Sequence, residues 1–238
     1  MRVGVFIDGQ NVTIGARYAF GRQDGANGTG NMHPLLLGRA LAGDCDLVEI
    51  RYVTGIPSPD VDRQRWEAER RRHDLMAATD VVVLEKPLRY RWQWDIRNER
   101  DLGDPRDHKG DTLSAKVKAR NVGQEKGIDV WLALDALTMC TRSDIDKVII
   151  ATADTDLDMV PQHLQMLPGH GETIVAQAKV LSNKRDLHHN NAYHETMAID
   201  ESIFVRSRDD FDYARDLDEE EVAAFVKRIG ADSDGIRD

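Results

Sequence analysis

The stretch VGVFIDGQN, from Val3 to Asn11, decides the fold that we expect for this chain. Its first five residues are apolar or glycine, which predicts a strand buried on both faces in the middle of a parallel sheet. The strand ends on a carboxylate, Asp8, and Gly9 allows a sharp turn before a helix that begins near Asn11. Because ligands of open α/β sheets bind beyond the carboxyl ends of the strands, Asp8 and Asn11 are predicted to lie at the functional edge.

The rest of the chain alternates between strand patterns and helix patterns. Strands are predicted over Leu47–Gly55, Asp80–Glu85, Asp146–Ala151 and Glu172–Ala176, with an edge strand over Ser202–Val205. Helices are predicted over Val12–Phe20, Pro34–Ala42, Asp62–Thr79, Val130–Thr141 and Leu157–Leu167, whereas Tyr90–Val122 is expected to be irregular. This alternation predicts an α/β fold with a mainly parallel central sheet.

The length of 238 residues is in the range of one large domain with a small appendage. We expect a domain over residues 1–206 and an acidic extension over 207–238 that holds one helix, Leu217–Ile229, and a disordered end. The two cysteines, Cys45 and Cys140, are far apart and lack CxxC spacing, which argues against a zinc site or a disulfide framework.

Neither a membrane span nor an export signal is predicted. No apolar run approaches the roughly 20 residues that a membrane helix needs, and Met1 and Arg2 lead at once into the first strand. We therefore expect a cytoplasmic protein. The net charge of −10 does not exclude a nucleic-acid partner, because many basic residues are concentrated in the segment from Arg63 to Lys118.

Carboxylates follow strands or begin helices at three places: Asp8, Asp129, and the pair Asp154 and Asp156. Each has an ordinary structural explanation, since Asp129 is placed where a helix N-cap belongs and Asp8 could be a turn residue. Parallel neighbouring strands would bring all three places to one edge, where unpaired acids repel one another unless a cation lies between them. Hard divalent cations prefer such oxygen ligands.

Three segments resemble the motifs of a known family. IDGQN at Ile7–Asn11, KGIDVWLALD at Lys126–Asp135 and ATADTDLDMVP at Ala151–Pro161 resemble the motifs of the NYN domain of the PIN-like nucleases, in its bacterial LabA-like branch. The resemblance extends in order and spacing over roughly residues 1–205. It departs from the family's Ser-Gly-Asp-x-Asp-Phe motif, because Thr152-Ala153 replaces Ser-Gly and Leu157 replaces Phe.

The resemblance implies a Rossmann-like, three-layer α/β/α sandwich with a metal-dependent ribonuclease site. Its implied Mg²⁺ or Mn²⁺ ligands are Asp8, Asp129, Asp154 and Asp156, with Asn11 as a further catalytic residue and Asp135 and Thr152 in supporting positions. A divalent cation suits phosphodiester cleavage, because it can activate a water and neutralise charge on the phosphate.

RNA is the expected partner, and a homo-oligomer is compatible with the sequence. The candidate phosphate-binding cations are Arg17, Arg89, Arg91, Lys109 and Lys126. Tyr90, Trp92 and Trp94 are candidates to stack on the bases of a single strand, and we expect the segment Tyr90–Lys118 to form a flap over the acidic edge.

Two further interpretations stand beside the endoribonuclease. The first is a non-catalytic NYN module that binds RNA or a protein partner, since a fold does not determine function. The second and weaker one is a metal-dependent phosphohydrolase that acts on small substrates at the same acids. A complete set of self-repelling carboxylates favours the enzyme over the binding module.

Overall fold

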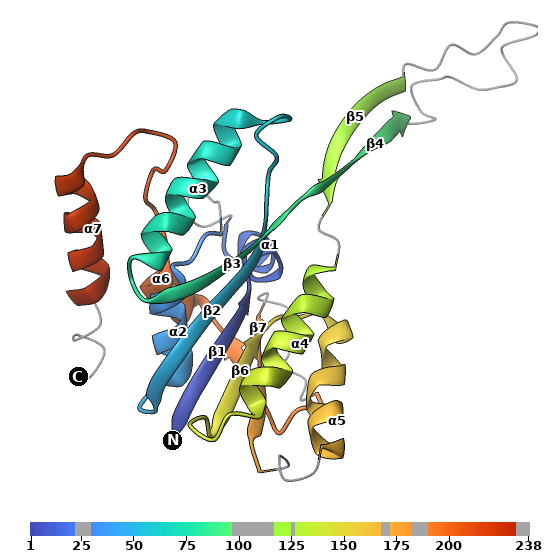
Figure 1. The fold of residues 1–238 in the computed structure, drawn as a ribbon, viewed down its shortest axis with the longest axis vertical. Helices are drawn as coiled ribbons and strands as arrows, with labels where there is room; N and C mark the ends of the chain where they lie inside the picture. Colours follow the sequence, from blue (N-terminus) through green and yellow to red (C-terminus); the bar gives the residue numbers. More distant parts are fainter. Residues whose placement is uncertain (22–29, 97–116, 125–126, 168–171, 182–189, 232–238) are drawn as a thin grey trace, which may run out of the picture.

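The computed structural model describes residues 1–21, 30–96, 117–124, 127–167, 172–181 and 190–231. At its centre lies a six-stranded sheet in which every neighbouring pair of strands is parallel (Figure 1). In chain order its strands are β1 (Arg2–Asp8), β2 (Asp46–Ile56), β3 (Val81–Pro87), β6 (Lys147–Ala151), β7 (Ile174–Val180) and β8 (Glu195–Ile199).

The order of the strands across this sheet is β3-β2-β1-β6-β7-β8. The chain builds one half of the sheet outward from β1, then returns to β1 and builds the other half from β6. The boundary between β1 and β6 is therefore the topological switch point, where open α/β sheets leave a crevice beyond the carboxyl ends of the strands.

Helices cover both faces of the sheet (Figure 1). The helices are α1 (Gly9–Ala19), α2 (Pro34–Ala42), α3 (Arg63–Ala77), α4 (Ile128–Cys140), α5 (Met159–Met166), α6 (Glu201–Ser207) and α7 (Glu219–Ala231), with the short 3-10 helix η4 (Thr155–Asp158) before α5. Buried side chains of α1, α2, α3, α6 and α7 form one hydrophobic core, and those of α4, η4 and α5 form the other. The three-layer α/β prediction is confirmed.

Strand β1 is buried on both faces, as its apolar sequence predicts. Val3, Val5 and Ile7 pack into the first core and Phe6 into the second, and all four are at most 1% exposed. Since β1 lies between β2 and β6, neither face nor edge of the strand is available to water, and Asp8 is carried to the end of a fully enclosed strand.

Gly9 has a different role from the sharp turn that we predict. It is the first residue of α1 and has no positive φ. A Cβ at this position would lie 2.4 Å from the ring of Tyr52 on β2, so glycine is needed for space. Because Gly9 has no side chain, the start of α1, directly after Asp8, packs closely against Tyr52 of the sheet.

The prediction that Tyr90–Val122 is irregular is wrong for the residues that the structure describes. β4 (Arg89–Ile96) and β5 (Val117–Gln124) pair as an antiparallel ribbon, consistent with the strand-favouring Tyr, Trp, Ile and Val residues in them. The predicted flap is also wrong in this part, because the ribbon projects away from the body of the molecule (Figure 1). Residues 97–116 of that segment lie outside the described residues.

The predicted edge strand at Ser202–Val205 is wrong, because these residues belong to helix α6. Asp200 caps this helix, since its carboxylate accepts a hydrogen bond from the backbone N–H of Ile203 at 2.9 Å. The edge strand is β8, which directly precedes this cap. The capping signal thus decides between helix and strand for a short apolar run.

The predicted C-terminal helix is present as α7. Phe225 and Ile229 of α7, together with Tyr213 before it, are buried in the same core as α2 and α3. Residues 232–238, where we predict disorder, lie outside the described residues. Across the described ranges, no helix is both long enough and apolar enough to cross a membrane.

Candidate active site

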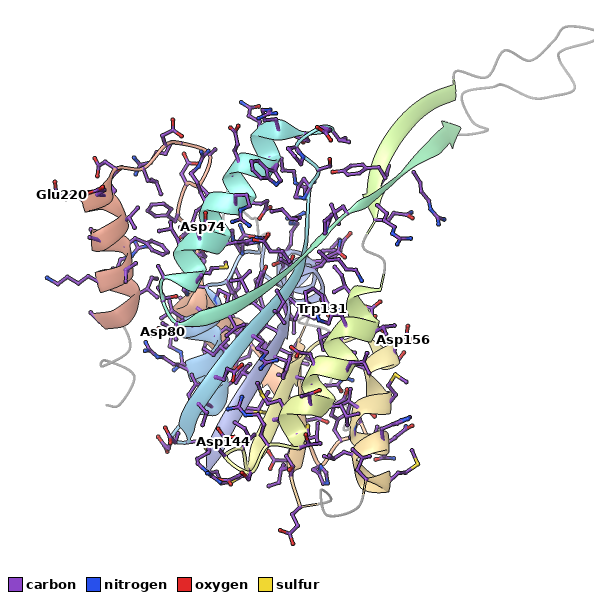
Figure 2. The ribbon with its side chains drawn as sticks, viewed as in Figure 1. Asp74, Asp80, Trp131, Asp144, Asp156 and Glu220 are labelled. Carbon is purple, nitrogen blue, oxygen red and sulfur yellow. The ribbon has the colours of Figure 1, made fainter. Side chains whose placement is uncertain are left out.

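The candidate site lies at the switch point, where three segments distant in sequence meet. β1 ends at Asp8, β6 ends at Ala151 and continues into Thr152 and Asp154, and α4 begins one residue before Asp129. Figure 2 shows Asp156 at the same end of α4 and α5 as Trp131, whereas Asp144 lies at the opposite end of these helices. The carboxyl ends of β1 and β6 thus bring the predicted acids to one edge.

Asp8 is the most enclosed of these acids, with only 5% of its surface exposed. Its Oδ1 accepts a hydrogen bond from the backbone N–H of Asn11 at 3.1 Å, which caps α1. Its Oδ2 accepts one from the hydroxyl of Thr152 at 3.0 Å. Because each oxygen has a fixed donor, the orientation of the carboxylate is determined by the protein before any ligand binds.

Asn11 and Thr152 connect β1, α1 and the loop after β6. The side-chain Oδ1 of Asn11 accepts a hydrogen bond from the backbone N–H of Ala153 at 2.9 Å. The Thr152 hydroxyl also accepts one from the backbone N–H of Asp154 at 3.1 Å. Thr152 therefore contacts both Asp8 and the loop that carries Asp154, while a supporting role for it stays a prediction. Among the described residues, the bond that holds the Asn11 side chain uses its oxygen, and the amide nitrogen can act as a donor.

The loop that carries the last pair of acids has its own internal bond. Asp154 caps η4, and its Oδ1 accepts a hydrogen bond from the backbone N–H of Asp156 at 2.9 Å. The next acid, Asp158, accepts a hydrogen bond at 2.9 Å from the side-chain nitrogen of Asn190, a residue just before β8. One bond is at each end of η4, so Asp154 and Asp156 stand on a short turn that is anchored at both ends.

A shallow pocket of about 320 Å³ opens at this edge. Its lining residues are Asp8, Gln10, Asn11, Ile14, Gly15, Asp129, Ala153 and Asp154. Three of the four predicted acids and Asn11 thus share one cavity, whereas Asp156 lies beside it. The sequence analysis did not select Gln10, Ile14 or Gly15, although the helical spacing of the last two from Asn11 (i+3, i+4) would have placed them on its face.

The electrostatics of the pocket show that these acids influence one another. The pKa of Asp8 is raised to about 6, chiefly by burial and also by the negative charges of Asp129 and Asp154, against the lowering effect of its hydrogen bonds. Partial loss of hydration raises the pKa of Asp129, with additional repulsion from Asp154 and Asp156. Each acid thus destabilises the ionised form of another, which a bound cation would reverse.

A ready-made metal cage is absent from the described part of the chain. Within it, no three His, Cys, Asp or Glu side chains lie close enough to form a closed metal-binding group. The donor set nevertheless fits Mg²⁺ or Mn²⁺, because it consists of carboxylate oxygens around an open pocket. Mg²⁺ in particular keeps several of its waters and needs only one or two direct carboxylates.

Asp129 is placed differently from the helix cap that we predict. The cap of α4 is Gly127, with a φ of 74°, and Asp129 stands in the first turn. Its carboxylate is consequently exposed at the pocket and is not occupied in capping the helix. An acid in the first turn also interacts favourably with the helix dipole.

Asp135 lies on α4 away from the pocket, where it forms an ion pair with Arg51 of β2. This contact agrees with a structural role, since six residues along a helix turn the side chain to another side. Among the predicted phosphate-binding residues, Arg17 is exposed on α1, and Arg89 and Arg91 are exposed at the base of the ribbon. None of these three lines the pocket. Lys109 and Lys126 lie outside the described residues.

Comparison with known proteins supports the family that the motifs suggest. The model of the NYN domain matches residues 2–188, which include every segment that lines the pocket. A crystal structure of a protein of unknown function from Vibrio parahaemolyticus is similar, with 18% identity, a TM-score of 0.47, and coverage of 84% of this chain and 93% of that chain. None of the curated proteins matches this chain.

Proposed function

Because the chain belongs to the NYN-domain family, whose fold is nuclease-like, we propose that it is a metal-dependent ribonuclease. The observation that carries the proposal is the buried carboxylate of Asp8, which is fixed by two hydrogen bonds and repelled by Asp129 and Asp154. An arrangement that raises the free energy of its own ionised acids is favourable when it holds a cation. The motifs further favour the LabA-like branch of the family.

Asp8, Asp129 and Asp154, which line the pocket, would hold the cation directly or through its bound waters, and Asp156, whose charge acts on Asp129, would add to the negative field there. When bound, Mg²⁺ or Mn²⁺ supplies an activated water and neutralises negative charge on the phosphate. Asp8 contributes a fixed orientation, because Asn11 and Thr152 hold both of its oxygens. Asp129 and Asp154 are less enclosed than Asp8.

Asn11 is suited to bind the substrate. Its Oδ1 is occupied by the N–H of Ala153, and this bond fixes which end of the amide faces which partner. The amide N–H groups can then donate to a phosphate oxygen in the pocket that Asn11 lines. Asn11 thus orients the scissile phosphate without competing for the cation.

RNA as the substrate is supported by cations outside the pocket. The chain has a net charge of −10 and the pocket is acidic, so a polyanion must be attracted by local positive groups. Arg89 and Arg91 on the ribbon and Arg17 on α1 are exposed, and none of the three lines the pocket. A small phosphate ester bound among the lining residues would gain little from cations outside that lining, which favours a polymeric substrate.

The experiment is an RNA cleavage assay with Mn²⁺, repeated after removal of the metal with EDTA, together with thermal melting under both conditions. Wild type should cleave only with metal and should melt at a higher temperature with Mn²⁺, because a ligand that binds only the native state stabilises it by mass action. Asp154→Asn should lose both effects. Asp44→Asn, an exposed acid in the turn before β2, should behave like wild type.

Four results would contradict the proposal. Cleavage that persists in EDTA would exclude the metal, and an equal Mn²⁺ shift in Asp154→Asn would place the cation elsewhere. RNA binding without cleavage in wild type would favour the non-catalytic module. Hydrolysis of a small phosphate ester with no action on RNA would favour the phosphohydrolase.

A further inference from the structure

An exposed apolar stripe runs along α1 from the rim of the acidic pocket. Ile14 is 40% exposed and Tyr18 is 80% exposed, although both are large hydrophobic side chains. Ile14 lines the pocket and Tyr18 follows four residues later, one turn along the same helix. The stripe is thus continuous with the candidate active site, and its far end is an open aromatic ring.

The helix geometry aligns Tyr18 with the pocket. Residues spaced by three, four and seven lie on one face of a helix, and Tyr18 has these spacings from Gly15, Ile14 and Asn11. All three of those residues line the pocket. With a rise of 1.5 Å per residue, the Cα of Tyr18 is about 6 Å beyond that of Ile14. Helical side chains lean in general toward the N-terminus, and the N-terminal part of α1 is the part that lines the pocket.

Other residues of α1 make its contacts with the hydrophobic core, so Tyr18 is not needed for packing. The opposite side of the helix is already buried through Val12, Ala16 and Phe20. Gly15 lies against Val180 of β7, and a Cβ on Gly30 would lie 2.5 Å from the backbone of Arg17, so the neighbouring sides of α1 are covered too. Tyr18 is exposed to solvent on the face of α1 that also carries the pocket residues Asn11 and Ile14.

We propose that Tyr18 stacks on the base of a nucleotide adjacent to the phosphate held in the pocket, so that the substrate is RNA unpaired at that nucleotide. The inference rests on the proposed function and names its substrate class. Stacking on an aromatic ring is tolerant of sequence because every base has a π-face. A base inside a duplex already stacks on its neighbours and offers Tyr18 no free face.

Binding is measured by fluorescence anisotropy with a short, unstructured RNA of mixed sequence. All variants carry Asp8→Asn to prevent cleavage. Tyr18→Ala should weaken binding of this single strand roughly 5- to 150-fold, the range of one lost base stack, whereas Tyr18→Phe should retain it. The control is Met166→Ala on α5, because Met166 is also largely exposed, at 67%, but belongs to another helix. The affinity of this variant for the RNA should be unchanged. The same RNA annealed to its complement should bind more weakly and show no dependence on Tyr18.

A walk of single abasic sites along the strand locates the stacked base. In the Tyr18 parent, one abasic position should cost most of the affinity, and in Tyr18→Ala that position should cost nothing further, because the two changes remove the same contact. Cleavage mapping with the protein that retains Asp8 should place this position next to the scissile bond. Equal affinities of Tyr18→Ala and its parent, or equal Tyr18 dependence for duplex and single strand, would overturn the inference.

This design separates the two proposals. If the protein with Asp8 intact cleaves RNA with Mn²⁺ and Tyr18→Ala neither binds nor cleaves differently, stacking is wrong and the ribonuclease stands. If wild type does not cleave but single-strand binding depends on Tyr18, the ribonuclease is wrong and the stacking platform stands as part of a binding module.

Discussion

Two aspartates of this protein are equally buried, and they differ in the sign of the charges around them. Asp8 and Asp209 are each 5% exposed. Asp8 faces a pocket and two other acids, whereas Asp209 accepts a hydrogen bond from the hydroxyl of Tyr213 at 2.8 Å and lies 3.8 Å from the guanidinium of Arg72. Burial raises the pKa of both carboxyls, so burial alone does not distinguish a functional acid from a structural one.

The neighbours do distinguish them. Arg72 and Tyr213 lower the pKa of Asp209, which favours its ionised form inside the core. Asp129 and Asp154 raise the pKa of Asp8, and what opposes them among the described residues is two hydrogen-bond donors, not a cation. The ionised form of a buried acid beside a cation is stabilised by the protein itself. The ionised form of a buried acid beside other acids is stabilised only when a ligand of opposite charge binds.

The largest expected effect is the loss of cleavage in Asp8→Asn. Substitution of a residue that only supports a metal ligand typically lowers activity about 10–100-fold. Removal of the charge of a ligand should therefore lower cleavage at least about a hundredfold. Stability should change little or rise, because the substitution removes a carboxyl whose ionised form is disfavoured by burial. RNA cleavage and urea unfolding of the same preparation measure both quantities. If Asp8→Asn lowered the stability but left the cleavage per folded molecule unchanged, Asp8 would have a structural role like that of Asp209.

Asp209→Ala should give the reverse pattern. Removal of this carboxylate leaves Glu69, 3.6 Å away, as the remaining counter-charge of the buried Arg72 guanidinium, and leaves the Tyr213 hydroxyl without its acceptor. The expected loss is about 3 kcal/mol of unfolding free energy, near the lower limit for broken buried pairs because the Arg72 contact is long. Cleavage per folded molecule should be unchanged at a temperature where the variant remains folded. A loss of activity beyond the unfolded fraction would contradict the contrast.

The positive charge of Arg72, which lies near Asp209, also acts on a buried histidine. The pH dependence of the unfolding free energy can therefore test for this positive environment. His33 is fully buried, and burial together with the charges of Arg72, Arg228 and Arg39 lowers its pKa to about 3. The native ring stays neutral while the unfolded ring is protonated below about pH 6.5, so the unfolding free energy must fall as the pH drops from there toward 3.

The expected loss from this histidine is about 2 kcal/mol at pH 5 relative to pH 7. His33→Asn provides the comparison, because asparagine can still accept the capping hydrogen bond from the N–H of Leu35. The raised pKa values of Asp8 and Asp209 act in the opposite direction, but both proteins share them and they cancel in the difference. Parallel stability curves for the two proteins would show that His33 is protonated equally in both states.

The smallest effect concerns the exposed cations of the ribbon. Replacing Arg89 and Arg91 together with alanine should reduce the slope of log K against log salt for single-stranded RNA by about 1.4, at 0.7 for each phosphate contact. Their removal should leave stabilisation by Mn²⁺ intact, because neither residue lines the pocket. The matched control is the pair Arg206→Ala and Lys227→Ala, two exposed cations on α6 and α7. Equal slopes for both double variants would mean that the ribbon does not hold RNA.

Much of the candidate site could be predicted from local patterns. The continuous apolar run of β1 predicts an enclosed strand because only a central parallel strand buries both faces, and its last residue, Asp8, must then lie at the carboxyl edge. Asp154 and Asp156 follow β6 in the same way. The β4–β5 ribbon also had a local signal in its strand-favouring residues, but the length and charge of that segment concealed it.

Other features depended on contacts between distant residues. Helical spacing turned Asp135 away from the pocket, but only the fold paired it with Arg51, and only the approach of Tyr52 shows why position 9 must be glycine. The cap at Gly127, which leaves the Asp129 carboxylate facing the pocket, also differs from the local prediction.

By itself, the sequence determined the parallel α/β class and the set of acids at the strand ends, because periodicity and strand direction are local properties of the chain. Only the tertiary structure decided that β1 lies beside β6, and therefore that Thr152 holds Asp8 and that Ala153 holds Asn11. It also decided which buried carboxylate has a cation as its neighbour. These outcomes depend on the burial and charge of groups more than a hundred residues apart, whose energies no local pattern contains.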